Sequence, residues 1–201
     1  MIYVDVWYKQ KLLNGQQLWS YSSFILVNDR GSLIFDFSIC HHGGPQTIEF
    51  LTKRVSALGA VQSGQFLVNC DTYVSTPSLP PQRTVHVVHN SEHPSSVFAI
   101  LESGQKTIPL VADRLFDLLM LKIKNIYTKK QPTIESKGPR FELADFCIKL
   151  GSVTISQNFK GVLVEVEYKP CVVPAYCQGL MREFLQGFLG SCFIKNSRCN
   201  G

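Results

Sequence analysis

The sequence has 201 residues, of which 45% are hydrophobic and only 17% are charged. A chain of this length forms one domain or at most two and needs no metal or disulfide to support its core. The charged share is below the usual ~25%, which fits a protein that buries surface against a partner and equally a compact monomer rich in strands.

The net charge of +5 is too small, without clustering, to indicate a nucleic-acid-binding protein. The chain has neither an apolar run of about 18 residues nor the pattern of a signal peptide, so we expect no membrane span. Seven cysteines without repeated spacing indicate reduced thiols, and hence a cytoplasmic or nuclear protein.

Residues 1–44 contain both tryptophans, Trp7 and Trp19, and share no repeat with the remainder of the chain. Short apolar runs predict strands here, and Gly-containing pairs predict turns. These are the strands Ile2–Val4 and Phe24–Val27 and the turns Asn14-Gly15 and Asp29–Gly31. The segment His41–Pro45 is the clearest break in the chain.

Pro45 stands where a first helical turn begins, and an apolar stripe follows it as far as Gly59. The stripe consists of Ile48, Leu51, Val55 and Leu58. Strand signals come next, at Phe66–Cys70, Thr84–Val88, Val97–Leu101 and Ile108–Val111. A loop over 75–83 separates the first two, and Ser103-Gly104 predicts a hairpin turn between the last two.

Asp113 is placed to cap a helix over Leu115–Ile123, because its side-chain oxygen can accept from a free N–H of the first turn. Helical spacing predicts a buried face of Leu115, Phe116, Leu119 and Ile123. Further strands are predicted at Thr133–Glu135, Phe141–Leu150 and Ser152–Ile155, with Gly151 allowing a tight bend between the last two.

The segment Gly161–Gly190 organises the rest. In Gly161–Tyr168, apolar residues alternate with Glu165 and Glu167, as in a half-buried strand. From Cys177 to Leu189 apolar residues recur at steps of three and four, and Gly190 is placed to end this helix. The apolar stripe covers more than half of the helix circumference, which indicates that another surface covers part of it.

Seven or so strands with helices inserted at intervals, without strict βαβ alternation, predict a single α+β domain. We expect an antiparallel sheet that curls towards a β-barrel, with flanking helices.

Glu165 and Glu167 are the only carboxylate pair at strand spacing. This pair resembles the Glu-x-Glu strands of tunnel-type triphosphatases, which hold a metal ion inside a β-barrel. That chemistry also needs acidic residues from other strands and several cations aimed at the phosphates. We therefore favour a solvated face of the sheet and keep a divergent metal-dependent polyphosphatase or RNA triphosphatase as the alternative.

A zinc site could be suggested from His86, His89, His93 and Cys70, but His86 and His89 point to opposite faces of a strand. Surface or turn histidines fit better. The group Cys40-His41-His42 has no second cluster at zinc-finger spacing. No metal and no cofactor are therefore predicted.

Cys171 and Cys177 flank a turn at Pro170–Pro174, and a first-turn position would mildly lower the pKa of Cys177. We favour buried structural cysteines. The basic stretch Lys122–Arg140 is interpreted as a solvated linker rather than a phosphate or acidic-partner site. No catalytic residue is predicted.

Several stretches together resemble the family of Mediator of RNA polymerase II transcription subunit 20, the animal TRF-proximal proteins. The likeness runs over about residues 47–191. The matching stretches include Glu49–Arg54, Cys70–Tyr73, His89–Pro94, Phe116–Lys124, Ile134–Arg140, Lys149–Thr154, Glu165–Tyr168, Pro170–Val173 and Glu183–Ser191.

This resemblance implies a β-barrel with flanking helices and a non-catalytic, nuclear role in the Mediator head module. It implies a heterodimer with Mediator subunit 18, tethered by the C-terminal helix of subunit 8, with RNA polymerase II reached indirectly. Direct contact with nucleic acid or membrane is not expected.

The chain departs from the family pattern at both ends. We expect an atypical N-terminal extension over 1–44, the subunit 20-like domain over 45–191, and an atypical tail over 192–201. Family members continue into a further helix that the tail does not resemble.

Overall fold

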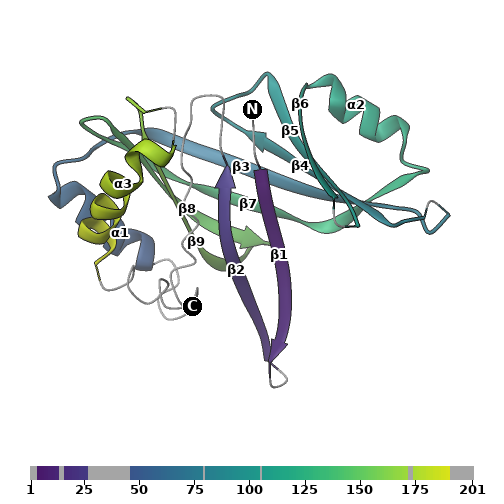
Figure 1. The fold of residues 1–201 in the computed structure, drawn as a ribbon, viewed down its shortest axis with the longest axis horizontal. Helices are drawn as coiled ribbons and strands as arrows, with labels where there is room; N and C mark the ends of the chain where they lie inside the picture. Colours follow the sequence, from purple (N-terminus) through teal and green to yellow (C-terminus); the bar gives the residue numbers. More distant parts are fainter. Residues whose placement is uncertain are drawn as a thin grey trace. The chain divides into compact units, whose positions relative to one another are not determined.

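The computed structural model describes residues 4–13, 16–26, 46–78, 80–104, 106–171 and 174–190. Near the N-terminus, β1 (Val4–Leu13) and β2 (Gln16–Leu26) pair antiparallel as a two-stranded sheet of their own, coloured purple in Figure 1. The predicted strand Ile2–Val4 meets β1 only at Val4, and Phe24–Val27 coincides only with the end of β2, so most of both strands was not predicted. The two strands flank the expected turn at Asn14-Gly15. The predicted turn at Asp29–Gly31 and the tail from residue 192 lie outside the described residues.

The main sheet has seven strands in the order β6-β5-β4-β3-β7-β8-β9. Its strands are β3 (Val61–Ser75), β4 (Arg83–Asn90), β5 (Ser96–Ser103), β6 (Lys106–Asp113), β7 (Tyr127–Leu143), β8 (Phe146–Ile155) and β9 (Asn158–Tyr168). The helices are α1 (Gln46–Ala57), α2 (Leu115–Lys122) and α3 (Pro174–Leu189). This is the predicted α+β class, an antiparallel, barrel-like sheet with helices, and β6 and β9 stand at its two ends.

Two compact units share this sheet. The first consists of Met1–Gln65, Gly138–Ser152 and Lys160–Gly201, and the second of Phe66–Lys137 and Val153–Phe159. Strands β3, β7, β8 and β9 each contribute residues to both units.

In the first unit, alternation on β9 works as predicted, because Val162, Val164 and Val166 are all buried. Phe146 of β8 stacks on Phe184 of α3 at 4.2 Å between ring centroids, which joins this apolar face to the helix. Helices α1 and α3 lie side by side (Figure 1), where Arg54 donates to the carbonyl oxygen of Gly187.

The predicted helix ends are confirmed. Gly190, at φ +58°, follows α3, and its N–H donates to the carbonyl of Gln186. Gly59, at φ +92°, follows α1 in the same way, with its N–H donating to Ser56. Both positions need the left-handed conformation that glycine adopts without strain.

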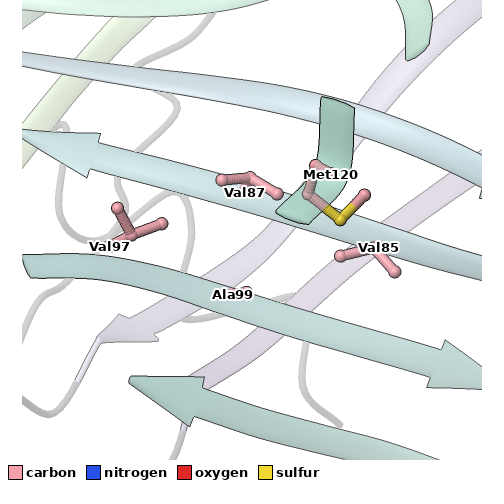
Figure 2. Packing of buried hydrophobic residues seen from close by; sticks show 5 residues of the cluster. All are labelled: Val85, Val87, Val97, Ala99 and Met120. Atoms are coloured by element: carbon pink, nitrogen blue, oxygen red, sulfur yellow. The ribbon is translucent and has the colours of Figure 1, made fainter. Parts of the chain in front are cut away.

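In the second unit, α2 packs on β4 and β5. Met120 sits over Val85, Val87, Val97 and Ala99, as Figure 2 shows. As predicted, Asp113 accepts a hydrogen bond at 2.8 Å from the first N–H of the helix.

The predicted buried face of α2 was wrong in part. Phe116 and Ile123 pack against the core, but the deepest residue is Met120, while Leu115 and Leu119 are exposed. Helix α2 is apolar nearly all round, so its spacing alone could not select the face that meets the sheet.

The predicted bend at Gly151 was also wrong. Strand β8 continues through Gly151, and the chain turns instead between β7 and β8 at Ala144, which has φ +48°. The glycine that matters sterically is Gly138 of β7, where a Cβ would overlap the carbonyl oxygen of Leu150. Glycine here permits close approach of two strands rather than a turn.

Candidate functional site

The face of β8 and β9 that lies opposite the buried valines carries a buried ion pair. Lys149 donates from Nζ to Oε1 of Glu165 at 2.8 Å, and the two residues are only 5% and 7% exposed. The prediction that Glu165 lies on a solvated face was therefore wrong. Alternation assigned the correct face, but it could not show that this second face is covered as well.

The carboxylate of Glu142 lies on the same charged face. Arg140 and Lys169 both donate to it, at 3.0 and 2.6 Å. Hydrogen bonding from Lys169 holds the pKa of Glu142 below its usual value. Arg140 also donates from Nε to the sulfur of Cys147, yet burial raises the pKa of that thiol. Cation and carboxylate thus neutralise each other on this face.

The polyphosphatase alternative is not supported by this arrangement. Glu165 and Glu167 do share a face, but Glu165 is paired with Lys149, and Glu142 of neighbouring β7 is engaged by its own cations. Within the described residues, no three His, Cys, Asp or Glu side chains are grouped to hold a metal ion. A hollow of about 370 Å³ beside β7 and β8 is lined by Thr133, Glu135 and Lys137 among others, and Glu135 is paired there with Lys137.

The histidines have separate partners, and His86 and His89 point to opposite faces of β4 as expected, but His86 is largely buried rather than a surface or turn histidine. His86 contacts the hydroxyl of Thr72 at 3.1 Å and lies 3.7 Å from Glu102. Burial lowers the pKa of His86, while the Glu102 charge opposes this shift. His89 points to the other face and bonds Asp117 at 2.9 Å.

The remaining members of the suggested zinc cluster are also apart. His93 meets the ring of Phe98 edge-on, at 6.0 Å between centroids. Burial, helped by the charge of Asp71, raises the pKa of Cys70 to about 12, so this thiol stays protonated. The group Cys40-His41-His42 lies outside the described residues.

Cys177 is buried, as favoured, whereas Cys171 is only half-buried. The suggested lowering of the Cys177 pKa was wrong. Burial raises the pKa of Cys177, and its contact with Cys171 adds to this. The basic stretch Lys122–Arg140 is not a linker, because it forms the end of α2 and most of β7. One of its cations, Lys129, pairs with Asp71 at 2.7 Å.

An apolar groove of about 330 Å³ lies along α3, and we call it the α3 groove. Its lining residues are Leu58, Leu143, Phe146, Leu180, Glu183, Phe184, Gly187 and Phe188. Leu58 and Leu180 are both exposed. The described residues therefore cover only part of the wide apolar stripe predicted for this helix. A partner that covers the rest remains a prediction.

Sequence reasoning missed two features of this molecule. The Lys149–Glu165 pair had one weak signal, a lone lysine inside the apolar run Phe146–Leu150. The exposed leucines of α2 had none, because their spacing also fits a buried face. Among the described residues, no helix is both long and apolar enough to cross a bilayer.

Fold and surface together define a class: an α+β domain with a barrel-like antiparallel sheet, paired charges and exposed apolar side chains. The family model described as "TATA-binding related factor (TRF) of subunit 20 of Mediator complex" matches residues 37–199. The chain belongs to this family.

Relatives named Mediator of RNA polymerase II transcription subunit 20 agree. The Aedes aegypti protein is 65% identical over 161 residues, covering 80% of this chain and 74% of its own length. The Anopheles gambiae protein is 70% identical over 149 residues, which cover 74% of this chain and 68% of that protein. The Homo sapiens protein is 45% identical over 152 residues, covering 73% and 70%.

Among solved structures, the PH1012 protein from Pyrococcus horikoshii OT3 shows partial similarity, with a TM-score of 0.43 and 13% identity. The match covers 70% of this chain and 83% of that one, and it bears on neither the fold nor the function.

Proposed function

We propose that this chain works as a non-catalytic subunit of the Mediator coactivator complex. It sits in the head module and helps to transmit regulatory signals to RNA polymerase II through protein–protein contacts, in the nucleus. The observation that carries this proposal is family membership, with up to 70% identity to curated subunit 20 proteins over most of the chain.

The geometry supports a role in contact rather than in chemistry. Catalytic carboxylates need to be free to bind a metal or move a proton. Here Glu165 is paired with Lys149, and Glu142 is held between Arg140 and Lys169. Large apolar side chains remain on the surface at the same time, and exposed apolar patches are typical of protein interaction sites.

The partners we propose are Mediator subunit 18, as a heterodimer, and the C-terminal helix of subunit 8. Contact with the remainder of the head module and with RNA polymerase II follows indirectly, without direct binding of nucleic acid or membrane. Residues 45–191 form the interaction domain in this proposal, and residues 1–44 and 192–201 are atypical additions to it.

Co-expression of the full chain with subunit 18 and the C-terminal helix of subunit 8 tests the proposal. We expect one peak containing all three in size-exclusion chromatography. A chain that elutes as a monomer in the presence of both would contradict it.

A matched pair of variants examines the α3 groove in the same experiment. Leu180→Asp places a charge among the groove residues, whereas Tyr176→Asp changes an exposed residue of the same helix that does not line the groove. Loss of co-elution for Leu180→Asp alone assigns the contact to the groove. Co-elution of both variants places the contact on another surface.

A further inference from the structure

Burial of the sheet face under α2 stops abruptly at β5. Val87 of β4, Ala99 of β5 and Leu110 of β6 are cross-strand partners and therefore share this face. Their exposed fractions are 1%, 3% and 46%. Ile108, two residues before Leu110 on the same face, is also exposed. The described part of the chain thus covers β4 and β5 with α2 and leaves the apolar face of β6 open.

The flank of α2 nearest this open strip is apolar too. Met120 points down onto the sheet (Figure 2), and Asp117 reaches His89 of β4 from one flank of the helix. Leu115 and Leu119 lie one turn apart on the opposite flank, on the side of β5 and β6. Both are exposed, at 66% and 48%. We call Ile108, Leu110, Leu115 and Leu119 the α2/β6 surface.

Unpaired cations border the α2/β6 surface. Lys106 lies on the same face of β6 as Ile108, because the two are two residues apart. Lys122 lies on the same side of α2 as Leu115, because it comes seven residues, or two helical turns, later. Neither makes an ion pair with any described residue, and both are exposed. Asp113 and Asp117 keep their negative charges, but Asp113 is bonded to the first N–H of α2 and Asp117 lies on the opposite flank at His89. Arg114, at the start of α2, is a third exposed cation. Three cations against two carboxylates leave the charge around this surface net positive.

We propose that the α2/β6 surface binds an acidic, amphipathic protein segment that packs as a helix beside α2. Apolar side chains of the segment cover Ile108 and Leu110 from above and Leu115 and Leu119 from the side. Its Asp and Glu residues meet Lys106 and Lys122. This is recognition of an amphipathic helix by an apolar surface, with charge setting the preference among partners.

Addition of a strand to the edge of β6 fits less well than a helix on its face. Pro109 stands in the middle of β6 and has no N–H to offer a neighbouring strand. A central proline is one way in which proteins protect an exposed sheet edge from strand addition. The face of β6, in contrast, is unprotected and continuous with the leucines of α2.

Segments of mixed acidic and apolar composition are typical of disordered activation domains. In that respect the inference deepens the proposed function, and its choice of partner depends on it. The binding geometry does not, because it is argued from α2 and β6 alone.

The probe is a fluorescein-labelled peptide of about 18 residues, roughly five helical turns, with Leu at i, i+3, i+4 and i+7 and Glu elsewhere. A control peptide has Lys in place of every Glu. Fluorescence anisotropy with the full chain should show saturable binding of the acidic peptide. We expect the basic peptide to bind at least about tenfold more weakly, and added salt to weaken the acidic one.

Two variants of one helix separate this surface from general charge effects. Leu115 and Leu121 are almost equally exposed, at 66% and 65%, and lie about 120° apart around α2. Leu115→Asp should weaken binding about tenfold, which corresponds to about 1.4 kcal/mol. Leu121→Asp adds the same charge on the other flank and should change binding less than about threefold.

Charge reversal at Lys122, as Lys122→Glu, provides a test that leaves the apolar residues in place, and circular dichroism establishes that each variant is folded. Hydrogen exchange should show protection of α2 and β6 when the acidic peptide is bound.

No saturable binding, equal binding of both peptides, or equal effects of Leu115→Asp and Leu121→Asp would each overturn the proposal. None of these results bears on co-elution with Mediator subunits, so the two proposals can fail separately.

Discussion

Removing one member of the Lys149–Glu165 pair should destabilise the protein far more than removing both. The two side chains are less than a tenth exposed, and their charged atoms are 2.8 Å apart. Lys149→Met or Glu165→Leu alone removes the 2.8 Å ion pair while the other charge stays buried. The double variant replaces the pair by apolar groups of similar size.

The magnitudes follow from opposing terms. At 2.8 Å and an effective dielectric constant of about 20, the attraction is about 6 kcal/mol. Desolvation of two ions costs several kcal/mol each, so the net contribution of the intact pair is close to zero. Each single variant should therefore lose about 3–5 kcal/mol of unfolding free energy, whereas the double variant should be neutral or up to about 4 kcal/mol more stable.

Urea unfolding followed by circular dichroism measures these differences directly. For a chain of this size each kcal/mol moves the melting temperature by roughly 2–4 °C. The exposed pair Lys53–Glu49, at 2.7 Å on α1, is the matched control, and Lys53→Met should leave the midpoint almost unchanged. If the double variant lost as much unfolding free energy as the two single variants together, it would refute the reasoning, because the two residues of a buried pair must be energetically coupled.

Three further outcomes are expected. Gly138→Ala should cost about 1–3 kcal/mol or more, because the new methyl group meets a backbone carbonyl, whereas Gly161→Ala meets open space and should be near neutral in the same urea titration. Asp113→Ala should cost about 0.5–2 kcal/mol through loss of the cap on α2, and an unchanged midpoint would contradict the capping role. Because burial lowers the pKa of His86 against the opposing charge of Glu102, the unfolded chain takes up the proton first as pH falls. Stability should thus be fully present above the ordinary histidine pKa and decline below it. His86→Gln should show a shallower decline between about pH 7.5 and about pH 5.5, and parallel curves for both proteins would count against this.

Periodicity predicted the fold class and most strands and helices. The alternation of Val162, Val164 and Val166 is a local property of one strand, and burial follows directly from it. The end of α3 at Gly190 was equally predictable, because it depends on one residue and its backbone conformation.

The errors share one physical cause, which is that they depend on contacts between distant segments. Met120 became the buried residue of α2 because β4 and β5 approach from that side, and no feature of an all-apolar helix encodes this. Glu165 can lie on a covered face because Lys149 of the neighbouring strand pairs with it, and the spacing within β9 does not contain this contact. The function came from the family likeness in the sequence, and no side-chain cluster at a single site would have supplied it.

The central claim is that this chain acts by contact with Mediator subunits. The most direct measurement is purification of the tagged full chain from insect-cell nuclei under mild salt, followed by quantitative mass spectrometry. We predict recovery of head-module subunits in near-equal amounts with the chain. Recovery of the folded chain without any Mediator subunit would contradict it.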